Sequence, residues 1–422
     1  MKKFYKMNLV LASAGLLTAG VAGSALAFHS GGVAECGGCH SMHSPNMASG
    51  FLLKGSDQSS TCLACHESPG DTAPRSYHIS TADTDMGPGI APIQRSPGGD
   101  FGWLKKDYAW TFSYGAPGSE DGDRHGHNIV AADQGYVADA TNTIAPGGTF
   151  PASSLQCNSC HDPHGKYRRM SDGTVATTGA PIIGSGSYDT SKVPGLGEAV
   201  GVYRLLAGSG YASTASLGVT YTGVPAAVAP ATYNRSEAVT QTRVAYGVQT
   251  TGGNNQWGQW CGTCHGDMHS SGAYVHPVDQ PLGATIAALY NAYVASGDMT
   301  GIATTAYLSL APFAQAAGDF TSLATNAKND DTVLAGPGTG DEVMCLSCHR
   351  AHASGFNSML RWNNESDFIV YDSHYPDAGT PAEVNYARGR TSAELEDAYY
   401  DRPATEFATY QRGLCNKCHA KD

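Results

Sequence analysis

Twelve cysteines in this 422-residue chain fall into six copies of one pattern, Cys-x-x-Cys-His, and no cysteine lies outside it. In chain order, motifs I to VI are CGGCH at 36–40, CLACH at 62–66, CNSCH at 157–161, CGTCH at 261–265, CLSCH at 345–349 and CNKCH at 415–419. Both thiols of such a motif can form thioether bonds to the vinyl groups of a haem, and the adjacent histidine can ligate the iron. A zinc knuckle or a disulfide framework would not need histidine at the same offset every time. The pattern therefore predicts six covalently bound c-type haems.

The predicted attachment residues are Cys36, Cys39, Cys62, Cys65, Cys157, Cys160, Cys261, Cys264, Cys345, Cys348, Cys415 and Cys418. The predicted proximal iron ligands are His40, His66, His161, His265, His349 and His419.

Ten other histidines could supply the sixth ligand of each iron, and six of them are needed if every haem has two histidine ligands. His43, His164 and His352 each follow a motif histidine by three residues. A residue so close cannot reach the opposite face of its own haem, but it can reach a neighbouring iron. The distal ligands that we expect are His43, His78, His127, His164, His276 and His352, with His29 and His269 in reserve and His125 and His374 last.

Methionine is the rival axial ligand, because it would raise the potential of its haem. Met42, Met268 and Met344 lie near motifs, but adjacency in sequence is wrong for ligating the same haem, so we expect them to pack instead. Irons with two histidine ligands have no open coordination position. The sequence therefore predicts no catalytic residue.

The N-terminal segment 1–27 is typical of a cleaved signal peptide. Lys2, Lys3 and Lys6 precede an apolar stretch, and Ala25-Leu26-Ala27 offers a cleavage site. Export without a membrane anchor would leave a mature chain that starts at Phe28. Loss of the three lysines takes the formal charge from −12 to −15, which argues against nucleic acids and anionic membranes as partners.

The elements that must position the motifs show little regular periodicity, and 52 glycines interrupt the chain. We expect a multihaem cytochrome c fold in a single domain over 28–422. It would be mostly coil and loops, with short α-helices and few β-strands wrapped around a chain of six haems. A helix is expected over 284–295, and strands over 218–221 and 243–248. Thr391 and Glu394 form a capping-box pattern before 395–400, and Pro403 could open a further helix.

Seven segments from the mature N-terminus to the last residue give a specific resemblance. FHSGGVAECGGCHSMH, GGDFGWLKKDYAW, CHDPHGKYRR, TRVAYG, AYLSLAPF, CLSCHRAHASGF and LCNKCHAKD resemble the OmcS-type hexahaem outer-surface cytochromes. The resemblance implies extracellular filaments with a continuous stack of bis-histidine haems, in alternating parallel and T-shaped pairs. It also implies that a histidine of one protomer, here His43, ligates a haem of the next. Glu67 and Ser68 after CLACH depart from the family, where a further histidine can occur.

The function that we expect is long-range extracellular electron transfer through protomers joined end to end, with other multihaem cytochromes and external acceptors as partners. One alternative is a soluble periplasmic or outer-surface shuttle that does not polymerise. A multihaem reductase is the other, but it needs an open iron position, often marked by CxxCK, whereas all six motifs here end in histidine.

Overall fold

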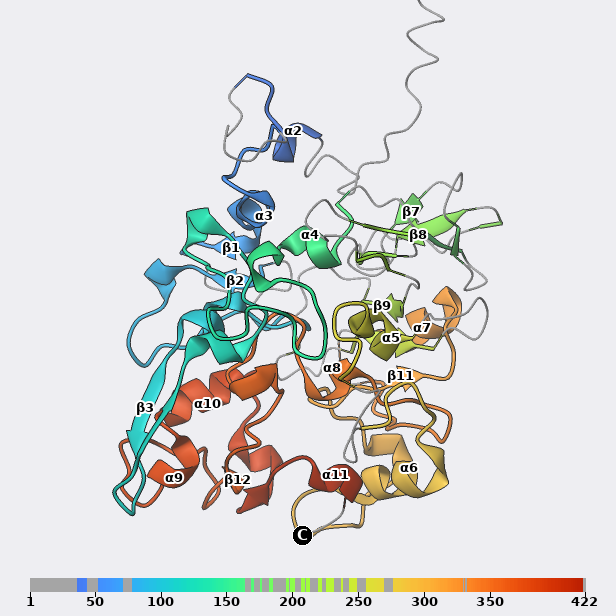
Figure 1. Ribbon diagram of the computed structural model, residues 1–422. Helices are drawn as coiled ribbons and strands as arrows, with labels where there is room; N and C mark the ends of the chain where they lie inside the picture. Colours follow the sequence, from blue (N-terminus) through green and yellow to red (C-terminus); the bar gives the residue numbers. More distant parts are fainter. Residues whose placement is uncertain are drawn as a thin grey trace, which may run out of the picture.

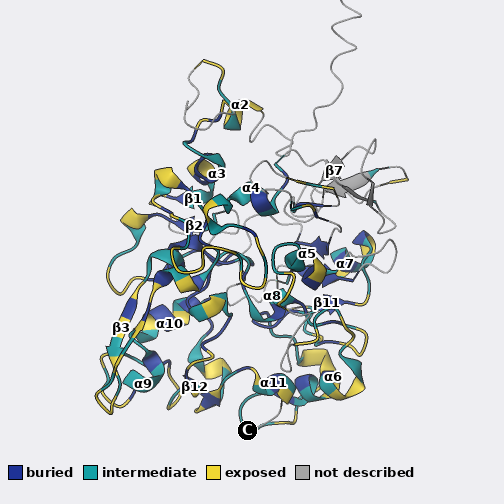
Figure 2. Ribbon diagram, in the orientation of Figure 1, coloured by how far each residue is buried: buried dark blue, intermediate teal, exposed yellow. Residues whose placement is uncertain are grey.

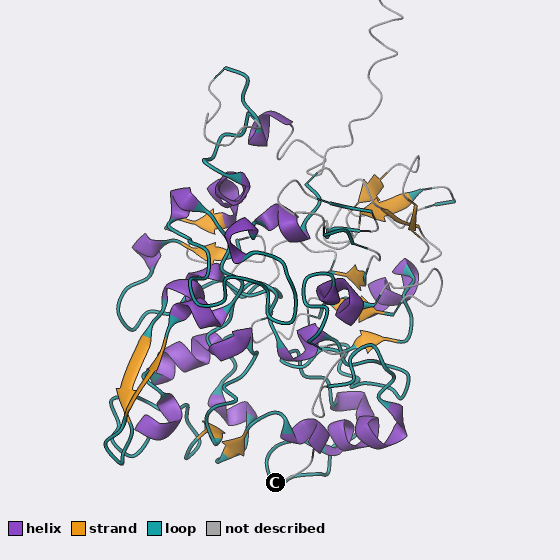
Figure 3. Cartoon of the chain, in the orientation of Figure 1, coloured by secondary structure: helices purple, strands orange, loops and turns teal. Residues whose placement is uncertain are grey.

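Short helices and small sheets joined by long irregular segments make up the part of the chain that the computed structural model describes (Figures 1 and 3). The described residues are 36–43, 52–70, 78–163, 168–170, 175–176, 182–184, 195–196, 198–201, 206–208, 210–212, 219–221, 225–230, 237, 243–248, 256–268, 276–328, 330 and 332–419. This architecture confirms the predicted fold class of coil with short helices and few strands.

The helices are one to three turns long, and each motif lies in or at one of them. The α-helices are α2 (Cys36–Cys39), α3 (Gln58–His66), α4 (Cys157–Cys160), α5 (Trp257–Gly262), α6 (Gly283–Ala292), α7 (Phe320–Asn326), α8 (Cys345–Cys348), α9 (Val384–Ala387), α10 (Ser392–Ala398) and α11 (Asn416–His419). Single 3-10 turns such as Phe101–Lys105 and Gly122–His125 occur between them. Contacts between α3 and α4, between α5 and α8, and between α6 and α11 link distant parts of the chain.

The strands form small separate sheets. A four-stranded sheet has the order β6 (Val175–Ala176), β5 (Arg168–Met170), β8 (Ala199–Gly201), β7 (Ile182–Gly184), and a three-stranded one has the order β11 (Ala314–Gln315), β10 (Ala245–Gly247), β9 (Ala226–Val228). The pairs are β1 (Glu67–Ser68) with β2 (Ser80–Thr81), β3 (Tyr108–Thr111) with β4 (Pro117–Glu120), and β12 (Phe368–Val370) with β13 (Gln411–Arg412).

Most of the predicted local elements are present. The helix expected over 284–295 is α6, although it ends at Ala292, and the strand expected over 243–248 contains β10. The capping box of Thr391 and Glu394 opens α10. Pro403 precedes only one 3-10 turn, Ala404–Glu406, and not an α-helix. The strand expected over 218–221 is wrong for 219–221, which is irregular, while Gly218 lies outside the described residues.

Buried carboxylates hold the irregular backbone where regular hydrogen-bond ladders are missing. Asp100 is fully buried and accepts hydrogen bonds from the backbone N–H groups of Thr81, Gln94 and Gly102 at 2.7–3.0 Å. Burial raises the pKa of Asp100. The three backbone hydrogen bonds and a fourth from the Thr81 hydroxyl oppose that rise. Buried N–H groups need hydrogen-bond acceptors. Here the Asp100 carboxylate accepts the bonds that the carbonyl groups of a neighbouring strand would otherwise accept.

Apolar side chains of the described residues form several clusters instead of one continuous core, and Figure 2 shows buried stretches in several parts of the ribbon. The largest joins Trp103, Tyr290, Leu310, Phe356 and Tyr399, which come from widely separated segments. Another lies around β9 and β10, and a third packs beneath α3. Several small apolar clusters, and not one core, thus hold the described segments together.

Candidate functional site

Each Cys-x-x-Cys-His motif forms one helical turn that brings its three reactive side chains to one side. In motifs I, III, IV, V and VI the backbone N–H of the histidine donates to the carbonyl of the first cysteine at 2.9–3.1 Å. Motif II lies within α3. Residues at i, i+3 and i+4 are neighbours on a helix surface. All twelve cysteines lie in described segments and are free of disulfide bonds, so both thiols and the imidazole of a motif can face one cofactor.

The motifs follow one another through the molecule in chain order. The thiols of the first cysteines of motifs II and III, Cys62 and Cys157, are hydrogen-bonded, which raises the pKa of Cys62 and lowers that of Cys157. Cys261 and Cys345, the first cysteines of motifs IV and V, form the same kind of pair. Contacts thus alternate, because motifs I and II, III and IV, and V and VI approach through the second cysteine of the earlier motif.

These contacts are electrostatic and act at longer range. Cys39 interacts with Cys65 and Cys160 with Cys264, whereas Cys348 interacts with both cysteines of motif VI, more strongly with Cys415 than with Cys418. In Figure 1 the motif helices accordingly run from α2 and α3 at the top, through α4, α5 and α8, to α11 at the bottom. A string of cofactors attached to these turns would extend from one end of the molecule to the other.

Three motif histidines face a second imidazole from a distant segment. The ring centres of His265 and His127 lie 6.0 Å apart. Those of His161 and His352 lie 6.3 Å apart, as do those of His419 and His276. With metal–nitrogen bonds of about 2.0 Å and about 1.1 Å from nitrogen to ring centre, imidazoles on opposite sides of one metal ion have centres about 6.2 Å apart. The observed separations fit an iron between the rings.

Hydrogen bonds to backbone carbonyls orient several of these rings. The Nδ1 atoms of His127, His265 and His349 lie 2.7–2.8 Å from the carbonyl oxygens of Ala351, Pro146 and Ser358, respectively. A carbonyl can only accept, so Nδ1 carries the proton and Nε2 keeps its lone pair for a metal. Burial lowers the pKa of His127 to about 4, which favours the neutral form that a metal ligand requires.

Close backbone packing positions His352. The imidazole stacks on the ring of Phe101 with centres 4.7 Å apart. The backbone N–H of His352 donates to the carbonyl of Gly98 at 2.6 Å. A Cβ on Gly98 would come within 2.8 Å of the imidazole, and a Cβ on Gly99 would lie 1.8 Å from the Ala353 carbonyl oxygen. Glycine is therefore required on this side of the ring.

A buried cluster of positive charge follows motif V. The side chains of Arg350, Arg361 and Arg402 are at most 1% exposed and surround Glu237. Glu237 accepts from Nη1 of Arg350 at 2.7 Å and from Nη1 of Arg361 at 3.4 Å, and its carbonyl accepts from Arg402. Within the described segments, the Nη2 atoms of Arg350 and Arg361 are buried without a hydrogen-bond partner.

One carboxylate does not balance three guanidinium groups, and buried unpaired donors cost free energy. The carboxylates of a haem would supply the missing acceptors, so this cluster fits the cofactor that the motifs imply. Sequence reasoning missed these arginines. The one signal was that Arg350 directly follows the motif histidine, which says nothing of Arg361 or Arg402.

The remaining histidines are placed as follows. His43 is exposed beside α2, and His78 lies next to motif II, where the N–H of Ile79 donates to the carbonyl of His66 at 2.9 Å. His29, His164 and His269 lie outside the described residues. Both ring nitrogens of His125 contact protein acceptors, Trp103 O and Glu120, and those of His374 contact Asp372 O and Glu383.

The methionines near the motifs differ from one another. Met344 is 1% exposed and packs around β10, as we expected. The expected packing is wrong for Met42, which is 79% exposed, and Met268 is 47% exposed.

Motifs that attach a cofactor through two thiols, and imidazoles separated by the width of one metal ion, define the class of c-type cytochromes with several haems. A scan against protein-family models found no match. The curated C-type cytochrome OmcS of Geobacter sulfurreducens is 53% identical to this chain over the full length of both.

Two solved structures give the same result. The cryo-EM structure of OmcS nanowires from Geobacter sulfurreducens has 52% identity and a TM-score of 0.83. The Outer Membrane Cytochrome S filament from the same organism has 52% identity and a TM-score of 0.84. In each case 94% of this chain and all of the other chain are covered. The chain belongs to the OmcS family of c-type cytochromes and carries covalently bound haem.

Proposed function

We propose that this protein conducts electrons outside the cell through six bis-histidine haems, in protomers joined end to end as a filament. The observation that carries the proposal is the set of three imidazole pairs with ring centres 6.0–6.3 Å apart, each joining a motif histidine to a distant segment. The relationship to OmcS, whose solved structures are nanowires and filaments, supports the assembly.

The ligand assignment follows from these pairs. His127 would be the distal ligand at motif IV, His352 at motif III and His276 at motif VI. Motifs I, II and V would draw on His43, His78 and His164. Of these, His43 is assigned to a haem of the adjacent protomer, which its exposure beside α2 at one end of the molecule supports.

The haems supply one-electron chemistry when bound, and the chain's own residues set the conditions for it. Motif turns fix the order I to VI. The alternation of first-cysteine and second-cysteine contacts supports two alternating kinds of haem pair. Two histidines at each iron would leave no open position, so the protein would carry electrons without being an enzyme. Buried arginines would neutralise haem carboxylates.

Export of this protein is part of the proposal. Segment 1–27 would be removed as a signal peptide, leaving 28–422 as one haem-bearing domain at the outer cell surface and in extracellular filaments. Across the described segments, no helix has the length and apolar character that crossing a membrane requires. Other multihaem cytochromes and external acceptors would exchange electrons with the filament.

Electron cryo-microscopy of material sheared from the outside of producing cells tests the proposal. We expect filaments with an unbroken chain of haems and density that links His43 to the iron of a neighbouring protomer. Dispersed monomers with six fully ligated haems would contradict the filament and favour a soluble shuttle.

A further inference from the structure

Lys417, one of the two variable residues of motif VI, is buried. It is 5% exposed, although lysine is rarely buried without a charged partner. Its Nζ donates to the carbonyl oxygen of Tyr293 at 2.7 Å. Tyr293 is the C-cap residue of α6, where unpaired carbonyl groups and the helix dipole favour a cation. The last motif is thereby attached to the end of a neighbouring helix.

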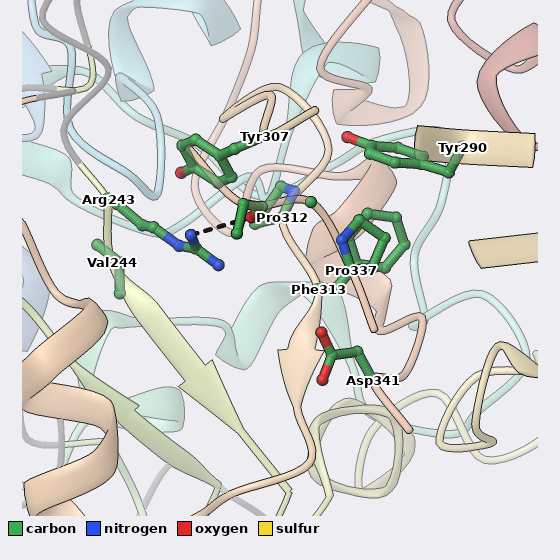
Figure 4. Close-up of a pocket in the computed structure, with 10 residues that line it drawn as sticks. Arg243, Val244, Tyr290, Tyr307, Pro312, Phe313, Pro337 and Asp341 are labelled. Carbon is green, nitrogen blue, oxygen red and sulfur yellow. Dashed lines mark hydrogen bonds between the residues drawn. The ribbon is translucent and has the colours of Figure 1, made fainter. Parts of the chain in front are cut away.

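Aromatic rings complete the surroundings of the ammonium group. Nζ lies 4.5 Å from the ring centre of Tyr290 and 5.4 Å from that of Tyr293. Tyr290 is itself held edge to face against Phe313, with ring centres 4.8 Å apart (Figure 4). Rings so placed stabilise a cation through their faces without neutralising its charge.

No carboxylate balances this charge within the described part of the chain. Nζ forms no ion pair there, and the one carboxylate that lines the same cavity of about 160 Å³ is Glu406. A carbonyl acceptor and two aromatic ring faces around Nζ suit the ammonium form of the side chain. A full positive charge therefore lies in a low-dielectric setting inside a haem-attachment motif.

The position of Lys417 in the motif separates its role from that of the haem ligands. Cys415, Cys418 and His419 share one side of the turn, whereas the hydrogen bond and ring contacts of the Lys417 Nζ are with α6 and its C-cap. Lys417 is thus not placed as a ligand, and its charge would reach a cofactor at this motif through its electric field.

We propose that the buried ammonium of Lys417 raises the reduction potential of the haem at motif VI. The inference rests on the proposed function, which places a haem ligated by His276 and His419 at this motif. Reduction adds one negative charge to the haem, and a nearby buried cation stabilises that charge. Lys417 would thus favour arrival of electrons at the last haem of each protomer.

Lys417→Met removes the charge and keeps an unbranched side chain. We expect spectroelectrochemical titration of the holoprotein at neutral pH to move about one sixth of the absorbance change to lower potential. The equilibrium constant for electron exchange with the neighbouring haem should change on the order of tenfold, which corresponds to about 59 mV for one electron. Lys417→Gln should have the same effect, and Lys417→Arg should leave the curve near that of the wild type.

Lys54→Met is the matched control. Lys54 also lies beside a motif, since its N–H donates to the Cys39 carbonyl at 3.0 Å, but its side chain is exposed. Water and salt screen such a charge, so its removal should shift the curve much less. An unshifted curve for both Lys417→Met and Lys417→Gln, with six low-spin haems present, would overturn the inference.

An equal shift in Lys417→Arg would also overturn it, because packing would then be the cause. Failure of the proposed function looks different. In that case the wild-type protein itself would lack six low-spin haems.

Discussion

The imidazole of His127 lies with its ring centre 6.0 Å from that of His265, and the two rings are inclined by 36°. His127 belongs to a segment that runs beside motif V, since its N–H donates to the carbonyl of His352. One short segment therefore connects motif IV to the residues that follow motif V. The segment that would ligate the iron at motif IV therefore also sets the distance between motifs IV and V.

Replacing His127 should open one iron. His127→Ala leaves His265 without its facing ring, so we expect six covalent haems, of which one is high-spin and binds carbon monoxide in the ferrous state. The measurement is a titration of the reduced protein with carbon monoxide. His374→Ala is the control, because His374 is exposed and hydrogen-bonded to Glu383. The His374→Ala protein should bind no carbon monoxide. A His127→Ala protein that also binds none would remove His127 from the ligands.

Removal of the His43 imidazole should stop polymerisation. We expect His43→Ala to retain six covalent haems, to make one of them high-spin and to abolish filaments, because the ligand that links protomers is lost. Electron microscopy and the spin-state spectrum of the same preparation check this. Filaments that persist alongside one high-spin haem would show that His43 ligates an iron of its own chain.

Gly99 should be needed for the orientation of His352. A Cβ there would lie 1.8 Å from the carbonyl oxygen of Ala353, at φ +99°. Gly99→Ala must displace Ala353 and the adjacent His352, so we expect a high-spin signal from the haem at motif III. Gly135→Ala controls for backbone strain, since Gly135 has φ +76° but no heavy atom within 4 Å of a Cβ. The control should lower the free energy of unfolding by only about 1–2 kcal/mol and leave the spin-state spectrum unchanged. Equal spectra for Gly99→Ala and Gly135→Ala would refute the steric explanation.

Acid should destabilise the protein through Glu120. Burial alone would raise the pKa of Glu120, but the hydrogen bond from His125 at 2.7 Å and the charge of Arg390 outweigh it and lower the pKa to about 2. The folded-state pKa thus lies below the unfolded value of about 4.3. The carboxylate therefore stabilises the fold above about pH 4.3, and this contribution is lost as the pH falls from there towards 2.

The contribution of ionised Glu120 is about 3 kcal/mol. Glu120→Gln should lower the melting temperature at neutral pH and flatten its decline in acid, as measured by thermal melting across pH. Glu396→Gln removes an exposed carboxylate and serves as the control. If the melting temperatures of the wild type and Glu120→Gln fall equally steeply as the pH drops below about 4.3, Glu120 does not contribute to acid sensitivity.

Local features of the fold were predictable because they depend on neighbouring residues. Thr391 and Glu394 form their capping box within one turn, and the apolar spacing of α6 identified that helix. Prediction failed at 219–221, where Tyr221 is buried and its hydroxyl donates to the carbonyl of Ser159. A tertiary contact, and not strand pairing, determines that segment.

The sequence by itself determined the predicted haem-attachment sites, because the two thiols and the imidazole of a motif meet within one helical turn whatever the rest of the chain does. Only the tertiary structure decided which distant segment faces each motif. His127, His276 and His352 reach their partner rings through contacts between residues far apart in the chain. The same holds for Arg361 and Arg402 around Glu237, because burial of charge depends on how segments pack and leaves no periodic signal in the sequence.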